Sequence, residues 1–72
     1  MTLAGYLKKY GVPQEEGVPI IMMVGSDDKA TAEMTDYLKA NPNKTGREYL
    51  EEAFRIGKKH RLTYGGETQS ER

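Results

Sequence analysis

The fold prediction depends on the stretch GVPIIMMVG, which occupies residues 17–25. Its centre, Ile20–Val24, is an uninterrupted apolar run that follows Pro19 and is closed by Gly25. A run this short between two helix breakers is typical of a strand. Because polar and apolar residues do not alternate in it, both faces of the strand are expected to be covered. Residues 13–19 are predicted to form a turn or a single helical turn.

Two helices with apolar faces are predicted on either side of this strand. The first is about two turns long and ends at Gly11, because glycine followed by Val-Pro stops a helix. Its apolar face comprises Leu3, Tyr6, Leu7 and Tyr10. The second begins at Ser26, Asp27 or Asp28, which are good N-caps, and ends at residues 41–43. Its apolar face comprises Ala30, Met34, Tyr37 and Leu38.

A third helix is predicted from Thr45 to about Lys59. Thr45 and Glu48 match the capping box, in which each side chain accepts a hydrogen bond from the other residue's backbone amide. The inner side of this helix is predicted to comprise Tyr49, Leu50, Ala53, Phe54 and Gly57. Residues 61–64 are predicted to form a short second strand that pairs with the first. The sequence thus predicts an α+β domain over residues 1–64, with three short helices around one apolar strand and a flexible polar tail at 65–72.

Composition indicates how the small core is stabilised and in which compartment the protein is found. The chain has 72 residues, no cysteine and one histidine, so neither disulfides nor a metal are expected to support its small core. Self-association or docking on a larger protein is therefore expected, with an ordinary monomer as the alternative. Lys8 and Lys9 interrupt the region where a signal peptide would be apolar, and no stretch is long enough to span a membrane. We expect a cytoplasmic protein.

Net charge is zero, but the charges are unevenly spread. Residues 14–36 contain six acidic side chains and one lysine, whereas residues 44–61 contain six basic side chains and three glutamates. The chain lacks the overall basic excess of a strong nucleic-acid binder.

No residues with the spacing of an active site were found. His60 stands between Lys59 and Arg61, and no second imidazole or thiol is present to complete a metal site. The adjacent carboxylates at 27–28 and 51–52 point to different faces of a helix, which does not suit a general acid and base. We predict a protein that is not an enzyme and has no catalytic residue, metal or cofactor.

Residues 20–60 resemble the ribbon-helix-helix family, whose members include the Arc and Met repressors. The resemblance lies in the order of strand, capped helix, turn and second helix. It implies a homodimer whose paired strands enter the major groove of DNA. Ile21 and Met23 would then point outward, and Lys44, Thr45 and Gly46 would hold a phosphate. This reading ranks second, because isoleucine and methionine cannot hydrogen-bond base edges.

The first expectation is a small regulatory protein, of the kind that phages and plasmids encode, that binds a protein of the transcription machinery. Its partner-binding residues are predicted to be Ile21, Met23, Lys44, Arg47, Lys58, Lys59 and Arg61. Two alternatives remain open for the strand: a covered core strand, or an exposed edge that adds to a partner's sheet. The basic cluster at 58–61 either stabilises a helix C-terminus or contacts an acidic protein or nucleic acid. A third function is a structural subunit of a larger assembly.

Overall fold

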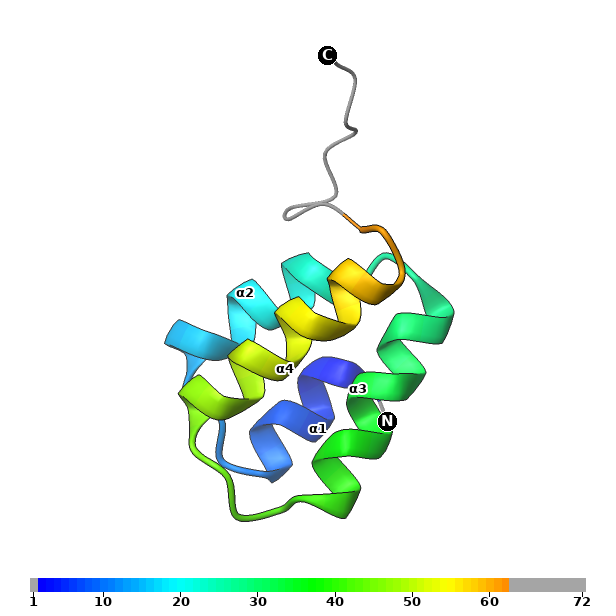
Figure 1. Cartoon of the computed structure of the whole chain (residues 1–72). Helices are drawn as coiled ribbons and strands as arrows, with labels where there is room; N and C mark the ends of the chain where they lie inside the picture. The colour runs from blue at the N-terminus through cyan, green and yellow to red at the C-terminus, as the bar shows by residue number, and fades with distance from the viewer. Residues whose placement is uncertain (1, 63–72) are drawn as a thin grey trace.

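The computed structural model describes residues 2–62 and contains four helices and no strand in that range (Figure 1). The helices are α1 (Leu3–Lys9), α2 (Gln14–Val24), α3 (Asp28–Ala40) and α4 (Gly46–Lys59). The predicted α+β class is therefore wrong, and the described domain is all-α. The predicted boundary at residue 64 and the tail at 65–72 lie outside the described residues.

The predicted strand Ile20–Val24 is the second half of α2. Pro19 lies inside this helix and has no N–H, so it cannot donate the usual helical hydrogen bond to the carbonyl of Glu15. The buried residues of α2 recur at spacings of three and four, which is the helical period: Gly17, Ile20, Met23 and Val24. Packing of this face therefore overrides the local preference of an apolar, β-branched run.

The ribbon-helix-helix resemblance is wrong for the same reason. A helix at residues 20–24 leaves no strand to pair between two subunits, so the ribbon that would enter a DNA groove does not exist. The short strand predicted to begin at Arg61 is also wrong over its described part. Arg61 has a φ of 59°, in the left-handed region, and ends α4 as the residue after the C-cap. The N–H of Leu62 donates to the carbonyl of Gly57 at 2.8 Å, and residues 63 and 64 lie outside the described residues.

The two helices predicted before and after the apolar run at residues 20–24 are confirmed. α1 ends at Lys9 with Tyr10 as its C-cap, and the next residue, Gly11, has a φ of 75°, which suits glycine. The N–H of Val12 donates to the carbonyl of Leu7 at 2.9 Å. α3 begins where Asp27 accepts a hydrogen bond from the N–H of Ala30 at 2.8 Å. Its buried residues are Ala30, Met34 and Leu38.

The predicted capping box of α4 is also confirmed. Thr45 Oγ1 accepts from the N–H of Glu48 at 3.1 Å, and Glu48 Oε1 accepts from the N–H of Thr45 at 2.8 Å. The buried residues of α4 are Tyr49, Ala53, Ile56 and Gly57. Phe54, which was predicted to face inward, is 41% exposed, and Ile56 is a core residue that the prediction missed.

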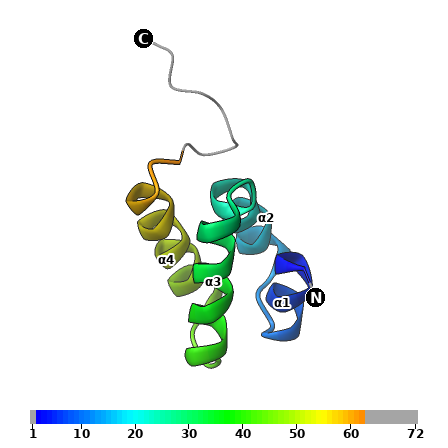
Figure 2. The same ribbon diagram turned by 90° about the vertical axis from the view of Figure 1, so that its right-hand side faces the viewer.

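α2 and α4 lie side by side and run in the same direction, as Figures 1 and 2 show. Their first turns meet where Gly46 approaches Pro13 and Glu16, and their later turns meet at Gly57 and Met23. A Cβ atom at Gly57 would lie 2.7 Å from the Sδ of Met23, so the close approach of the two helices requires glycine there. This is the most extensive contact between helices in the described domain.

All four helices contribute to one core, with α1 packed against α2 and α3. The largest fully buried side chains are Tyr49, Ile20, Met34, Leu38, Ile56 and Val24. The ring of Tyr49 meets Tyr37 edge to face at 6.2 Å, and its hydroxyl donates to the carbonyl of Asn41 and accepts from the N–H of Lys44. Among residues 2–62, no helix combines the length and the apolar character needed to cross a membrane.

Candidate binding surface

One side of α2 exposes large apolar side chains. Val18 is 45% exposed, Met22 41% and Ile21 36%, and all three lie on the part of the helix that turns away from the core. The prediction that both faces of this segment are covered is therefore wrong. α1 packs against α2 but leaves Ile21 accessible. A group of exposed apolar side chains on one element is typical of an interaction surface.

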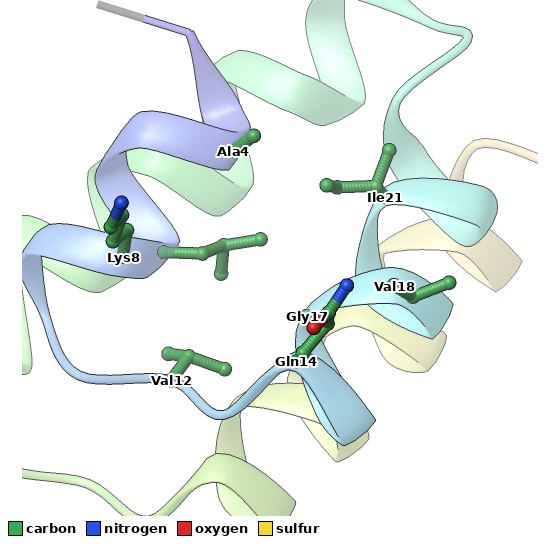
Figure 3. Close-up of a pocket in the computed structure, with 8 residues that line it drawn as sticks. Ala4, Lys8, Val12, Gln14, Gly17, Val18 and Ile21 are labelled. Atoms are coloured by element: carbon green, nitrogen blue, oxygen red, sulfur yellow. The ribbon is translucent and has the colours of Figure 1, made fainter.

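The exposed side of α2 borders a groove between α1 and α2, which we call the α1–α2 groove (Figure 3). It has a volume of about 440 Å³. The apolar residues that line it are Ala4, Leu7, Val12, Gly17, Val18 and Ile21. Its width depends on two small residues, because Ala4 has a single methyl group and Gly17 has no side chain. A Cβ atom at Gly17 would reach to 3.9 Å from Leu7 Cδ1.

Polar groups lie at one end of the α1–α2 groove. Lys8 on α1 and Gln14 on α2 line it, and Glu15 follows on the exposed side of α2. Within residues 2–62, none of these three side chains forms a hydrogen bond or ion pair with another residue. A mostly apolar groove with a few polar groups at one end binds apolar side chains and fixes their orientation by hydrogen bonds or charge.

The predicted partner-binding residues lie in four separate places. Ile21 is in the α1–α2 groove. Met23 is only 7% exposed and packs against Gly57, so the outward orientation that the ribbon-helix-helix resemblance gave it is wrong. Lys44 and Arg47 lie at the start of α4, where both side chains are exposed. The Nε of Arg47 is 3.4 Å from Glu51 Oε2, one turn further along the helix.

Lys58, Lys59 and Arg61 lie at the other end of α4, beside the middle of α3. Glu33 on α3 accepts a hydrogen bond from Lys59 Nζ at 3.0 Å, and its second oxygen lies 2.9 Å from His60 Nε2. These contacts with His60 and Lys59 hold the pKa of the Glu33 carboxyl below its ordinary value. The cluster at 58–61 therefore links α4 to α3, while Lys58 and Arg61 remain exposed.

The remaining basic residue of α4 is also paired with carboxylates. Arg55 forms hydrogen bonds with Glu52 and lies 4.0 Å from Glu33. These contacts raise the pKa of Arg55, chiefly through Glu52. Along α4, acidic partners thus offset much of the positive charge that the sequence places in residues 44–61. No group of three metal-binding side chains occurs among residues 2–62.

Sequence reasoning missed most of the α1–α2 groove, including Ala4, Leu7, Lys8, Gln14 and Val18. The signal that could have revealed it is the helical period of residues 14–24. At that period, Gly17, Ile20 and Val24 share one face, which leaves Val18 and Met22 on the opposite side. Comparisons with models of protein families, with curated proteins and with solved structures found no match to this chain.

Proposed function

We propose that this chain is a non-catalytic protein that acts by binding another protein, with the α1–α2 groove and the exposed side of α2 as the contact surface. The observation that carries the proposal is the exposure of Val18, Ile21 and Met22 together on one helix beside an apolar groove. Interfaces are distinguished by an apolar centre from which charged residues are depleted, with polar groups at the rim. Lys8 and Gln14 occupy such a rim position.

The charges favour a protein over a nucleic acid as the partner. Affinity for nucleic acid depends on several lysines or arginines that are available to phosphates. Here Arg47, Arg55 and Lys59 contact carboxylates of the same chain, and the net charge is zero. In its more specific form, the proposal is that the partner belongs to the transcription machinery and that the chain acts in the cytoplasm. It is supported by small size and by a composition without cysteine.

The proposal is tested by comparing immobilised wild-type chain with two matched variants in a quantitative capture from cell extract. Ile21→Lys places a charge in the groove, and Ala32→Lys places the same charge on the exposed surface of α3. We expect at least one protein to be retained by the wild type and by Ala32→Lys, and to be lost with Ile21→Lys. Circular dichroism first establishes that all three chains are helical.

Equal retention by all three chains would place the contact elsewhere and overturn the assignment of the groove. Loss of binding by both variants would indicate that added charge, and not the position of the side chain, controls retention. A titration of the purified partner against the same three chains then gives the loss of affinity. A charge placed at the centre of an apolar contact should weaken binding on the order of a hundredfold.

A further inference from the structure

We propose that the α1–α2 groove binds an amphipathic helix of another protein, which inserts apolar side chains between α1 and α2 and presents a carboxylate to Lys8. The inference rests on the proposed function, because it states the chemistry of the protein that this surface binds. Three features of the groove carry it: the apolar lining, the helical state of both walls, and the charge of Lys8.

The lining of the groove calls for apolar side chains from the partner. Figure 3 shows Ala4 on α1 and Ile21 on α2 at one end of the groove, with Val18 further along α2. The groove volume of about 440 Å³ leaves room for roughly two or three ring-sized side chains, since an apolar cavity of about 150 Å³ holds one benzene molecule. Filling this space would withdraw Val18 and Ile21 from water, which is the main driving force of association.

The partner segment is expected to be a helix, because the groove offers few hydrogen bonds to a polypeptide backbone. A backbone N–H or carbonyl that is buried without a partner costs free energy comparable to a lost hydrogen bond. Both walls are helices, most of whose backbone groups bond within the same helix, and residues 2–62 contain no strand edge to which an extended peptide could add. A helix satisfies its own backbone groups and can place an apolar face against apolar walls.

The charge of the groove determines the polar group of the partner. Among the described residues that line it, Lys8 alone carries a charge, and it forms no hydrogen bond or ion pair within residues 2–62. Residues 2–13 contain two lysines and no acidic side chain. The acidic residues in the first turn of α2 do not line the groove, and Glu16 approaches Gly46 at the start of α4. A carboxylate is therefore the group that complements the α1 side of the groove.

The position of Lys8 also determines where the carboxylate lies in the partner helix. Ala4 and Lys8 are one turn apart on α1, about 6 Å along the helix axis. The carboxylate is therefore expected about one turn from the apolar side chain that occupies the space beside Ala4, on the same face of the partner. In the partner's sequence, these two residues would be about three or four positions apart.

The test uses designed peptides of about 18 residues, because shorter isolated helices are marginal in water. The acidic peptide has leucines along one face and glutamates one turn from them, and the basic peptide has lysines in place of the glutamates. The scrambled peptide has the composition of the acidic one without its apolar face. Fluorescence anisotropy measures the binding of each labelled peptide to the full chain. We expect the acidic peptide alone to bind, with a Kd below about 100 µM, and to gain helical circular dichroism on binding.

Matched variants locate the binding and test its charge preference. Lys8→Glu should weaken binding of the acidic peptide roughly tenfold and make the basic peptide the tighter ligand. Lys29→Glu makes the same change on the exposed surface of α3 and should leave the order of the peptides unchanged. Ala4→Phe fills the groove without altering its charge and should weaken binding on the order of tenfold, whereas Ala32→Phe on α3 should have no effect.

Each other outcome overturns the inference, and the capture from cell extract decides the proposed function separately. If no peptide binds up to about 1 mM but the captured protein is still lost with Ile21→Lys, the partner has another form and the proposed function stands. If the acidic and basic peptides bind equally, or if Lys8→Glu leaves their order unchanged, no carboxylate faces Lys8. Equal binding of the scrambled peptide excludes an apolar helix face, and binding that Ala4→Phe does not weaken lies outside the groove. Equal capture by wild type and Ile21→Lys would overturn the proposed function, whether or not the peptides bind.

Discussion

α2 and α4 lie side by side and run in the same direction, yet they are stabilised by different kinds of interaction. α4 begins with a capping box and is joined to α3 through Glu33. α2 begins at Pro13 without a side-chain cap and contains both Gly17 and Pro19. α4 has a single large exposed apolar side chain, Phe54, whereas α2 exposes three, Val18, Ile21 and Met22.

The difference shows that local sequence signals determine α4, whereas tertiary packing determines α2. The signals for α4 are local, because Thr45 and Glu48 are three residues apart and its apolar residues follow one period. The helical state of α2 depends on what it packs against, chiefly α4 through Met23 and Gly57. An apolar surface in excess of what the core needs is also what makes α2 suited to binding. The same residues that obscure its secondary structure in the sequence provide its candidate binding surface.

The largest expected difference in stability is between alanine variants of two adjacent isoleucines of α2. Ile20 is fully buried, whereas Ile21 is 36% exposed. We expect Ile20→Ala to lower the free energy of unfolding by about 3 kcal/mol, because it leaves a cavity in the core. Ile21→Ala should cost less than about 1 kcal/mol, since the lost contacts are partial and alanine favours the helix. Urea unfolding of each variant measures both changes.

The neighbouring methionines serve as a second matched pair for this prediction. Met23 packs against Gly57, whereas Met22 is 41% exposed, so Met23→Ala should cost more than Met22→Ala. Similar costs at positions 20 and 21 would contradict the helix, because they would indicate a segment that is covered on both sides. That result would restore the covered strand predicted from the sequence.

The three helices with local signals could be predicted from the sequence, and α2 could not. Gly11, Asp27 and the Thr45–Glu48 pair fix helix ends through nearby backbone groups, so their effect does not depend on the rest of the fold. Pro19 and Gly17 are helix breakers by the same local rules. In α2 the burial of Ile20 and Val24 outweighs both of them, and such burial involves core residues of other helices, α3 and α4.

Of the residues predicted to bind a partner, Ile21 alone lies in the candidate binding surface. The ribbon-helix-helix resemblance turned Ile21 and Met23 outward, whereas the structure exposes Ile21 and buries Met23. A helical period turns Val18 and Met22 outward in place of Met23. Lys8 was not predictable, because its place in the groove follows from the packing of α1 against α2 and from no pattern within α1.

The next largest loss of stability is expected at the connection between α3 and α4. Side-chain hydrogen bonds hold this connection, whereas α2 begins without a side-chain cap. The buried Tyr49 hydroxyl bonds to the carbonyl of Asn41 and to the N–H of Lys44. Tyr49→Phe should therefore cost about 2 kcal/mol, because both backbone groups lose their partner. Tyr37→Phe is the matched control, since Tyr37 contacts Tyr49 through its ring. Equal costs in urea unfolding would show that the hydroxyl bonds add nothing to the connection.

A smaller effect is expected at the cap that distinguishes α4 from α2. Thr45→Ala removes the side-chain acceptor for the N–H of Glu48 and should cost about 1 kcal/mol. The matched control is Thr35→Ala, at a non-terminal position of α3. If thermal unfolding shows no difference between the two variants, the start of α4 depends on packing just as α2 does, and the contrast between the helices disappears.

The smallest expected effect concerns Glu33, which joins α3 to α4. Hydrogen bonds with His60 and Lys59 lower the pKa of Glu33 below its ordinary value of 4.5. A carboxyl whose pKa is lower in the folded state stabilises the fold above its unfolded pKa and loses that contribution as pH falls through its folded pKa. We therefore expect Glu33→Gln to reduce the loss of stability below pH 4.5. The change should be less than about 1 kcal/mol, because the pairs lie near the surface.

Glu48 also contributes to the loss of stability at acid pH, because its pKa is lowered, chiefly by the hydrogen bond from the backbone of Thr45. The difference between wild type and Glu33→Gln at each pH isolates Glu33, since Glu48 is unchanged in both. Asp36→Asn removes a carboxylate from an exposed site on the same helix and controls for the loss of charge. Added salt should shrink the Glu33 effect, because it screens pairs near the surface. If Glu33→Gln and Asp36→Asn change the profile equally, the link between α3 and α4 is packing alone, and α4 differs from α2 only in its cap.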